Sequence, residues 1–298
     1  MEYVQLGRSD LRISRIGFGC MSLGDEDAAN ETILNKAADS GINFFDTADL
    51  YAKGMNELSV GKALKARRSS IYLASKAGNQ WRADGSGWDW NPRKEYILSC
   101  IEGSLKRLQT DYIDLYQLHG GTLDDPIDET IEAFELLKQQ GKIRYYGISS
   151  IRPNVIREYI KRSNIVSVMM QYSLLDRRPE EMVLPLLQEH NIGVLVRGAV
   201  AQGLLVNKPA RAYLNYAPQQ VEQAAAAIHA VSNDNRHAAQ SALRFVLQHP
   251  AITCAVTGIR TPQQLEEAVN TISSPILTNA EMNLLLGSVE ANRYEQHR

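Results

Sequence analysis

Short apolar segments of β-type composition alternate with segments of helical spacing along the chain of 298 residues. The predicted strands are Arg15–Gly19, Ile42–Asp46, Ile71–Lys76, Tyr112–His119, Ile143–Ile148, Ile165–Met170, Gly193–Val196 and Ile252–Val256. The predicted helices between them include Ala28–Asp39, Arg93–Leu108, Ile127–Gln140 and Glu180–His190. Eight strands in strict alternation with helices predict an α/β fold, a closed (β/α)₈ TIM barrel, and an open doubly wound sheet is the alternative.

No change of composition, proline- or serine-rich linker or run of charge divides the chain, so we expect one domain over residues 1–298. Two short apolar runs within Val4–Ile13 flank a Gly-Arg-Ser-Asp turn, which predicts an N-terminal β-hairpin. This hairpin would cap the amino-terminal mouth of the barrel. Active sites of such barrels lie at the opposite, carboxyl-terminal ends of the strands.

The composition argues against several kinds of partner. With 22% charged residues and a formal net charge of -2, the chain has no basic surface for nucleic acid or an anionic membrane. No apolar run approaches the roughly 20 residues that span a bilayer, and Met1–Gln5 lacks the pattern of a secretion signal. Cys20, Cys100 and Cys254 are too few and too scattered for a disulfide framework or a zinc site. We therefore expect a cytoplasmic protein without a metal, and a monomer, because no exposed apolar helix face stands out.

Three consecutive predicted strands each end in a different ionisable residue: Asp46, Lys76 and His119. Helical stretches separate these strands, so we expect them to be parallel neighbours about 4.8 Å apart. The three side chains would then emerge side by side at the carboxyl-terminal edge of the barrel. Tyr51, in the loop that follows Asp46, can fold back over them. A carboxylate, an ammonium, an imidazole and a phenol at one place indicate proton transfer.

In this interpretation Tyr51 is the general acid that protonates a carbonyl oxygen as it becomes an alkoxide. An ammonium at Lys76 stabilises the phenolate that remains, and Asp46 orients that ammonium. His119 donates a hydrogen bond to the same oxygen and polarises the carbonyl. Each residue alone has a simpler interpretation. Asp46 could be a turn or cap residue and Lys76 a solvated cation. Tyr51 could be a packing residue and His119 an ordinary loop residue. A barrel isomerase or aldolase that uses Lys76 as a Schiff base is a further alternative.

The segment Asp46-Thr47-Ala48-Asp49-Leu50-Tyr51, together with Ser75-Lys76 and Leu118-His119, resembles the catalytic tetrad pattern of the aldo-keto reductases. The similarity extends from the first strand to the segment near Ala268. It implies a (β/α)₈ barrel that binds a nicotinamide cofactor across its carboxyl-terminal face and reduces aldehydes and ketones by hydride transfer. By this match Tyr51 is the proton donor, Lys76 and Asp46 tune it, and His119 orients the carbonyl. One departure is Ala52, where the family commonly has glycine.

The resemblance also implies a set of residues that bind NADPH. They are Gly19, Cys20, Met21, Asp46, Ser149, Ser150, Gln171, Arg197, Gly198, Gly203, Leu204, Leu205, Lys208, Gly258, Arg260, Thr261, Gln264 and Glu267. Ser149, Ser150 and Gln171 match the positions that bind the carboxamide, and Gly198–Leu205 matches the pyrophosphate loop. Ser150 and Ala268 both stand where the family usually has asparagine.

Two arginines of this chain bear on the choice of cofactor. Thr261 followed by Pro262 is a typical helix start, and a helix N-terminus beside the Arg260 guanidinium suits a phosphate. This segment resembles the family's site for the adenosine 2′-phosphate, which implies NADPH over NADH; an ordinary capped helix with an exposed arginine is the alternative. Arg197 stands where the family has an aromatic residue. We expect its planar guanidinium to lie against the nicotinamide ring and favour the reduced cofactor, and pairing with a neighbouring carboxylate is the alternative.

All three tryptophans fall in one segment, Gln80–Trp90, directly after the strand that carries Lys76. A long loop with clustered aromatic residues at the functional rim predicts a substrate wall or lid, and self-packing of the loop is the alternative. The candidate substrate contacts are Met21, Met55, Trp81, Trp88 and Trp90. Such a pocket would accept a small apolar or aromatic aldehyde.

Two other patterns are accidental. Gly17–Ser22 partly imitates a dinucleotide-binding fingerprint, but its last position is serine and an eight-strand pattern follows. Tyr72 and Lys76 have the spacing of a short-chain dehydrogenase pair, which works on a helix, whereas on a strand they lie about 13 Å apart. The sequence thus predicts an NADPH-dependent carbonyl reductase that acts on small molecules. A cofactor-sensing binding subunit of the same family with little turnover is the alternative.

Overall fold

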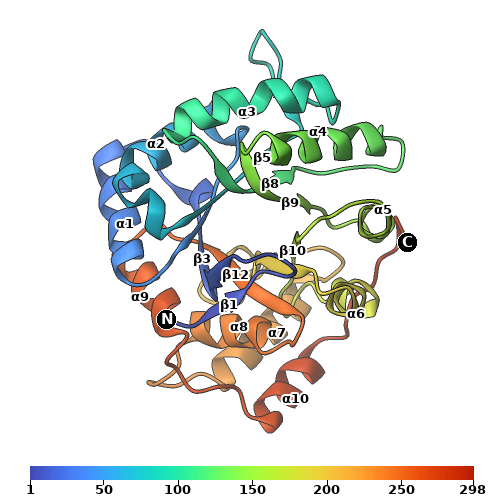
Figure 1. The fold of residues 1–298 in the computed structure, drawn as a ribbon. Helices are drawn as coiled ribbons and strands as arrows, with labels where there is room; N and C mark the ends of the chain where they lie inside the picture. The colour runs from blue at the N-terminus through green and yellow to red at the C-terminus, as the bar shows by residue number, and fades with distance from the viewer.

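The computed structural model describes residues 1–298 and contains a closed barrel of eight parallel strands (Figure 1). The strands are β3 (Ile16–Gly19), β4 (Phe44–Asp46), β5 (Tyr72–Ala77), β8 (Ile113–Leu118), β9 (Ile143–Ser149), β10 (Ser167–Gln171), β11 (Gly193–Arg197) and β12 (Ile252–Gly258). Their order around the barrel is β10-β11-β12-β3-β4-β5-β8-β9. Every predicted strand is present, so the closed barrel is confirmed and the open sheet is wrong.

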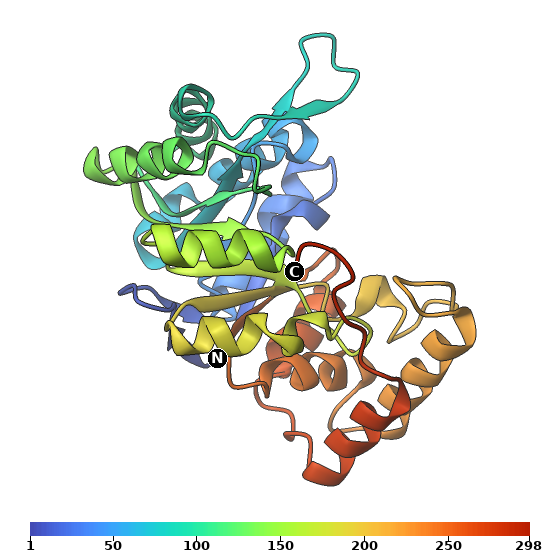
Figure 2. The same cartoon turned by 90° about the vertical axis from the view of Figure 1, so that its right-hand side faces the viewer.

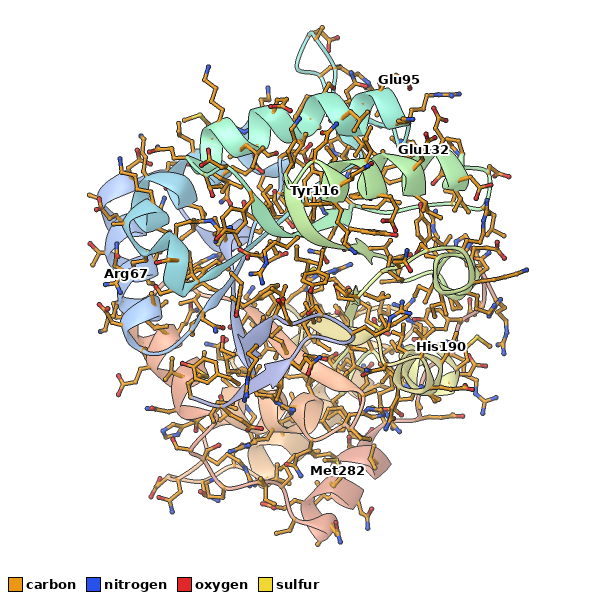
Figure 3. All side chains as sticks on the ribbon, in the orientation of Figure 1. Arg67, Glu95, Tyr116, Glu132, His190 and Met282 are labelled. Atoms are coloured by element: carbon orange, nitrogen blue, oxygen red, sulfur yellow. The ribbon has the colours of Figure 1, made fainter.

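Ten α-helices lie outside the barrel (Figures 1 and 2). They are α1 (Asp27–Asp39), α2 (Met55–Leu64), α3 (Lys94–Leu108), α4 (Ile127–Gln139), α5 (Pro153–Arg162), α6 (Val183–Glu189), α7 (Pro218–Ala230), α8 (Ala238–Leu247), α9 (Pro262–Asn270) and α10 (Asn279–Ser288). Their apolar stripes face the strands: α3 buries Ile97, Ile101 and Leu108. Glu95 of α3 and Glu132 of α4, both labelled in Figure 3, are exposed. No helix has both the length and the apolar composition of a membrane span.

One predicted helix, Glu180–His190, is wrong in its first part. The structure has a 3₁₀ turn at Arg178–Glu181, and α6 begins only at Val183. Met182 separates the two with φ of -152°, outside the helical region. Pro185 lies in the first turn of α6, where its missing N–H is not needed, and a longer helix would require that N–H.

The predicted N-terminal hairpin is confirmed. β1 (Tyr3–Gln5) pairs antiparallel with β2 (Arg12–Ser14), and Leu6 and Leu11 of the connecting turn belong to a buried cluster at the bottom of the barrel. Gly7 has φ of 52°, and a Cβ there would lie 2.3 Å from the carbonyl oxygen of Val166, just before β10. The hairpin therefore closes the amino-terminal end, on the left in Figure 2.

The tryptophan-rich segment is a second hairpin, where the sequence analysis predicted a loop. β6 (Asn79–Trp81) pairs antiparallel with β7 (Trp88–Trp90), with Trp81 opposite Trp88. Cross-strand aromatic pairs stabilise antiparallel strands, and the turn contains Asp84-Gly85, a common hairpin signal. Figure 2 shows this hairpin at the upper right, projecting from the side opposite the N-terminal hairpin.

Candidate active site

The carboxyl-terminal ends of three neighbouring strands bring the predicted proton-transfer residues together. β5 lies between β4 and β8, so Lys76 lies between Asp46 and His119. The Lys76 ammonium donates to Asp46 Oδ2 at 2.6 Å and to the carbonyl of Thr47 at 2.7 Å. It also lies 3.4 Å from the Tyr51 hydroxyl oxygen. The Tyr51 and His119 rings meet edge-on with centroids 5.7 Å apart. The four side chains of the predicted cluster therefore lie together.

The charge of Lys76 is set by its buried ion pair. Burial by itself lowers the pKa of Lys76, but the Asp46 carboxylate and the Tyr51 hydroxyl outweigh this effect and hold that pKa above its ordinary value. Lys76 is therefore an ammonium directed at the Tyr51 hydroxyl, and it can stabilise a phenolate there. A Schiff base needs a neutral amine, so the arrangement disfavours that alternative.

His119 is neutral in this environment. Burial, followed by the positive charges of Lys76 and Arg197, lowers the pKa of His119 to about 3. A neutral imidazole has one N–H donor and one acceptor nitrogen. The Nδ1 atom is buried and has no partner in the protein. His119 can therefore donate a hydrogen bond to a substrate oxygen but is not itself an acid at neutral pH.

Gln117 belongs to this cluster and was missed by the sequence analysis. Its Nε2 donates to Asp46 Oδ1 at 3.1 Å, while its Oε1 is buried without a partner. Asp46 is thus held from two sides, by Lys76 and by Gln117. Because alternate residues of a strand face the same side, a polar residue two positions before His119 was the available signal.

The turn that carries Tyr51 has an uncommon backbone. In η2 (Tyr51–Gly54), φ is 48° at Ala52, 54° at Lys53 and 87° at Gly54. All three values lie in the left-handed region, which costs residues other than glycine roughly 1–2 kcal/mol each. Ala52 therefore adds strain directly beside Tyr51. Such strain persists only where the surrounding structure holds it.

The predicted cofactor residues lie at the ends of β9, β10, β11, β12 and β3, which are consecutive around the barrel. They form one continuous arc along the carboxyl-terminal rim, and Asp46 on the next strand joins the arc to the Lys76 cluster. The side chains of Cys20, Leu204 and Leu205 are buried in the core. At these three positions only the backbone can face a ligand.

The loop after β11 has left-handed residues at four positions. Their φ values are 76° at Gly198, 45° at Ala201, 59° at Gln202 and 91° at Gly203. The amides of Ala201, Gly203 and Leu204 donate to the carbonyls of Gly198, Val200 and Ala201 within the same loop. The Lys208 side chain packs against Gly203, where an added Cβ would lie 3.2 Å from its carbons. The pyrophosphate site that the resemblance implies for this loop stays a prediction.

Arg197 forms a hydrogen bond with the side-chain amide of Gln171. Its Nη1 donates to Gln171 Oε1 at 3.1 Å, and Gln171 Nε2 donates to the Tyr213 hydroxyl at 2.8 Å. None of the ion pairs of the structure includes Arg197, so its predicted alternative pairing with a carboxylate is wrong. The guanidinium is exposed, and its charge acts on His119. Tyr213 orients Gln171 and was missed by the sequence analysis.

The start of α9 is capped as predicted. Thr261 Oγ1 accepts from the Gln264 amide at 3.2 Å, and Gln264 Oε1 accepts from the Arg260 amide at 2.8 Å. The Gln264 side chain is thus part of the helix cap. Glu267 Oε1 accepts a hydrogen bond from Gln263 Nε2 at 3.2 Å. The Arg260 side chain is exposed. A cavity of about 440 Å³ lies beside Arg260, between α1, β12 and the turn after β3.

The predicted substrate residues have different surroundings. Trp81 donates through Nε1 to the carbonyl of Leu50 at 3.2 Å, and Trp90 donates to Asp125 Oδ1 at 2.9 Å. Trp88 is 48% exposed, and Met55 is 58% exposed. Met21 is the most open of the set, at 70%. Trp88 and the two methionines are thus free to meet a substrate, whereas Trp81 and Trp90 are bonded to neighbouring loops.

Comparisons with known proteins agree with this fold. The sequence matches the aldo/keto reductase family over residues 15–288, and the chain belongs to that family. It is 51% identical to the oxidoreductase YqkF of Bacillus subtilis, with 100% of both chains covered. It is 34% identical over 235 residues to the NADH-specific methylglyoxal reductase of Escherichia coli, with 72% of each chain covered.

The solved structures show the same relationship. The chain is 51% identical to an aldo-keto reductase of Bacillus halodurans in its holo form, with a TM-score of 0.94 over 100% of this chain and 99% of that one. The TM-score to the apo form is 0.85 over the same shares. A glycerol dehydrogenase of Gluconobacter oxydans is 26% identical, with a TM-score of 0.87 over 99% and 98%. The protein is therefore an oxidoreductase of a family that acts on small carbonyl compounds with nicotinamide cofactors.

Proposed function

We propose that the protein reduces aldehydes and ketones to alcohols with NADPH, with Tyr51 as the general acid. The observation that carries the proposal is the Lys76 ammonium, which lies 3.4 Å from the Tyr51 hydroxyl while Asp46 holds it at 2.6 Å. A free phenol, with a pKa of about 10, gives up its proton reluctantly. The buried ammonium of Lys76 can stabilise the negative charge that the Tyr51 oxygen gains as its proton passes to a substrate.

Each of the four side chains has a different role in the reaction. When bound, the reduced nicotinamide supplies the hydride that reaches the carbonyl carbon. The Tyr51 hydroxyl gives its proton to the carbonyl oxygen as negative charge develops there, and Lys76 stabilises the phenolate left behind. Asp46 holds Lys76 in place. Neutral His119 donates a hydrogen bond to the same oxygen and polarises the carbonyl.

The arc along the rim suits an extended dinucleotide. Ser149, Ser150 and Gln171 would bind the carboxamide, and the left-handed loop Gly198–Leu205 would hold the pyrophosphate. The chain resembles the holo form of the Bacillus halodurans reductase more than its apo form, with TM-scores of 0.94 and 0.85.

The preference for NADPH rests on Arg260. The Escherichia coli relative is named for its specificity for NADH, so family membership alone leaves the choice of cofactor open. Arg260 is exposed beside the capped N-terminus of α9, where both its guanidinium and the helix dipole attract a phosphate. The 2′-phosphate of NADPH supplies that charge, and NADH lacks it.

Arg197 gives the site a second charge at the nicotinamide end. We propose that its guanidinium lies against the nicotinamide ring and weakens binding of the oxidised, positively charged form relative to NADPH. In Arg197→Tyr the ratio of the dissociation constants for NADP⁺ and NADPH should fall by about an order of magnitude, since one nearby charge is removed. An unchanged ratio contradicts this role.

The proposal is tested by following NADPH absorbance with a panel of aldehydes for wild type and Tyr51→Phe. Wild type should consume NADPH with apolar and aromatic aldehydes, and Tyr51→Phe should lose about 10²–10⁴-fold in kcat while still binding NADPH. A wild-type protein that binds NADPH without turnover would instead be the cofactor-sensing subunit. Full turnover in Tyr51→Phe would remove Tyr51 from the mechanism.

A further inference from the structure

The hairpin of β6 and β7 contacts the turn that carries Tyr51, and it does so through Trp81. The indole N–H of Trp81 donates to the carbonyl of Leu50, the residue before Tyr51, at 3.2 Å. The ammonium of Lys53, two residues after Tyr51, lies 5.0 Å from the centroid of the same indole ring. Trp81 thus touches the chain on both sides of Tyr51.

Other contacts hold the two ends of this turn. Before it, Cys100 Sγ donates to Asp49 Oδ2 at 2.8 Å. After it, Arg107 packs against Gly54, where an added Cβ would lie 2.8 Å from Nε. Between these ends the left-handed residues Ala52 and Lys53 are exposed. A strained backbone relaxes unless neighbouring groups hold it, and the Trp81 contacts are placed to do so.

We propose that Trp81 is a positioning residue for Tyr51. The hairpin keeps the strained turn in the conformation that directs the Tyr51 hydroxyl at Lys76 and at a bound carbonyl oxygen. This inference rests on the proposed function, and it gives Trp81 a role different from that of a substrate wall. A wall residue acts on substrate affinity, whereas a positioning residue acts on the rate of proton donation.

The first test separates these two effects with Trp81→Phe, which keeps an aromatic ring beside Lys53 but removes the N–H donor. The value of kcat should fall about tenfold, while KM for the aldehyde and the dissociation constant of NADPH change less than about twofold. The matched control is Asp89→Asn, which breaks the exposed ion pair of Arg82 and Asp89 on the same hairpin and should keep wild-type kcat. A rise in the aldehyde KM with kcat unchanged overturns the proposal. An equal fall in kcat in Asp89→Asn overturns it too.

A double-mutant cycle with Tyr51→Phe tests whether Trp81 acts through the Tyr51 hydroxyl. In the Tyr51→Phe background, Trp81→Phe should change the remaining rate less than about twofold, because the hydroxyl that it positions is already absent. A full tenfold loss in that background overturns the proposal. Wild-type turnover in Tyr51→Phe alone contradicts the proposed function instead, so the two failures are distinguishable.

Hydrogen exchange gives a readout that needs no turnover. Amide exchange in residues 50–55 should be about tenfold faster in Trp81→Phe than in wild type and unchanged in Asp89→Asn, because a lost hydrogen bond lowers the cost of local opening. Unchanged exchange in Trp81→Phe overturns the proposal. If Trp81→Phe does not fold, the exposed Lys53→Met removes the other contact and should lower kcat about twofold to threefold. A Lys53→Met variant with wild-type kcat and wild-type amide exchange then overturns the proposal.

Discussion

Replacing Lys76 by methionine should cost stability as well as activity, because it leaves a carboxylate unpaired in a buried site. The side chains of Lys76 and Asp46 are 1% and 6% exposed. Removing one partner of a buried ion pair costs about 3–5 kcal/mol. Gln117 still donates to Asp46 in the variant, which places the expected loss of unfolding free energy at the lower end, about 3 kcal/mol. The rate should fall at least about 100-fold, since Tyr51 loses its ammonium.

A second substitution separates the two effects. Adding Asp46→Asn to Lys76→Met removes the unpaired charge and keeps an oxygen that accepts from Gln117. The double variant should regain about 1–2 kcal/mol and remain inactive. Urea denaturation followed by tryptophan fluorescence measures the unfolding free energies, and NADPH oxidation measures the activity. An unfolding free energy of Lys76→Met within about 1 kcal/mol of wild type, the range of a surface pair, contradicts this prediction. A double variant that is less stable than Lys76→Met contradicts it as well.

Three further predictions concern the cofactor and the titrating groups. Arg260→Ala should raise KM for NADPH about 10–100-fold and leave KM for NADH within about twofold, since only the charged phosphate contact is lost; equal changes in steady-state KM contradict the phosphate site. His119, whose pKa is lowered to about 3, should show no titration between pH 5 and 8 by NMR of its ring, and a midpoint near 6.5 contradicts its burial. Burial raises the pKa of Asp49 to about 6, with a smaller opposing effect from Cys100, so the folded protein holds a proton that the unfolded chain releases near pH 4. Wild type therefore loses stability as pH rises through 6, and the stability of Asp49→Asn relative to wild type should increase by about 1 kcal/mol from pH 5 to pH 8. Urea denaturation at the two pH values measures this difference, which a pH-independent value contradicts.

The barrel could be predicted because its strands are buried on both faces and therefore read as apolar runs that helices separate. Asp46, Lys76 and His119 could be located for the same reason: each ends one such run, and parallel neighbours place their ends together. Tyr51 follows a strand at short range, so the chain cannot carry it far from that edge. These inferences needed only the order of the elements and the positions of the strand ends.

The missed features depend on contacts that the sequence does not encode locally. Gln117 is a polar residue inside an apolar run, and its partner Asp46 lies 71 positions away. Tyr213 meets Gln171 through a loop 42 residues further along the chain. The bond from Trp81 to Leu50 depends on a hairpin whose pairing was not predicted. In each case tertiary packing decides which polar atoms meet, and periodicity carries no information about it.

The central claim is that the Tyr51 hydroxyl donates the proton, and a single-turnover experiment tests it most directly. Enzyme loaded with NADPH is mixed with an aldehyde, and loss of NADPH absorbance reports the chemical step alone. We expect Tyr51→Phe to bind NADPH as wild type does and to react about 10²–10⁴-fold more slowly. A Tyr51→Phe protein that transfers its hydride at the wild-type rate would contradict the account.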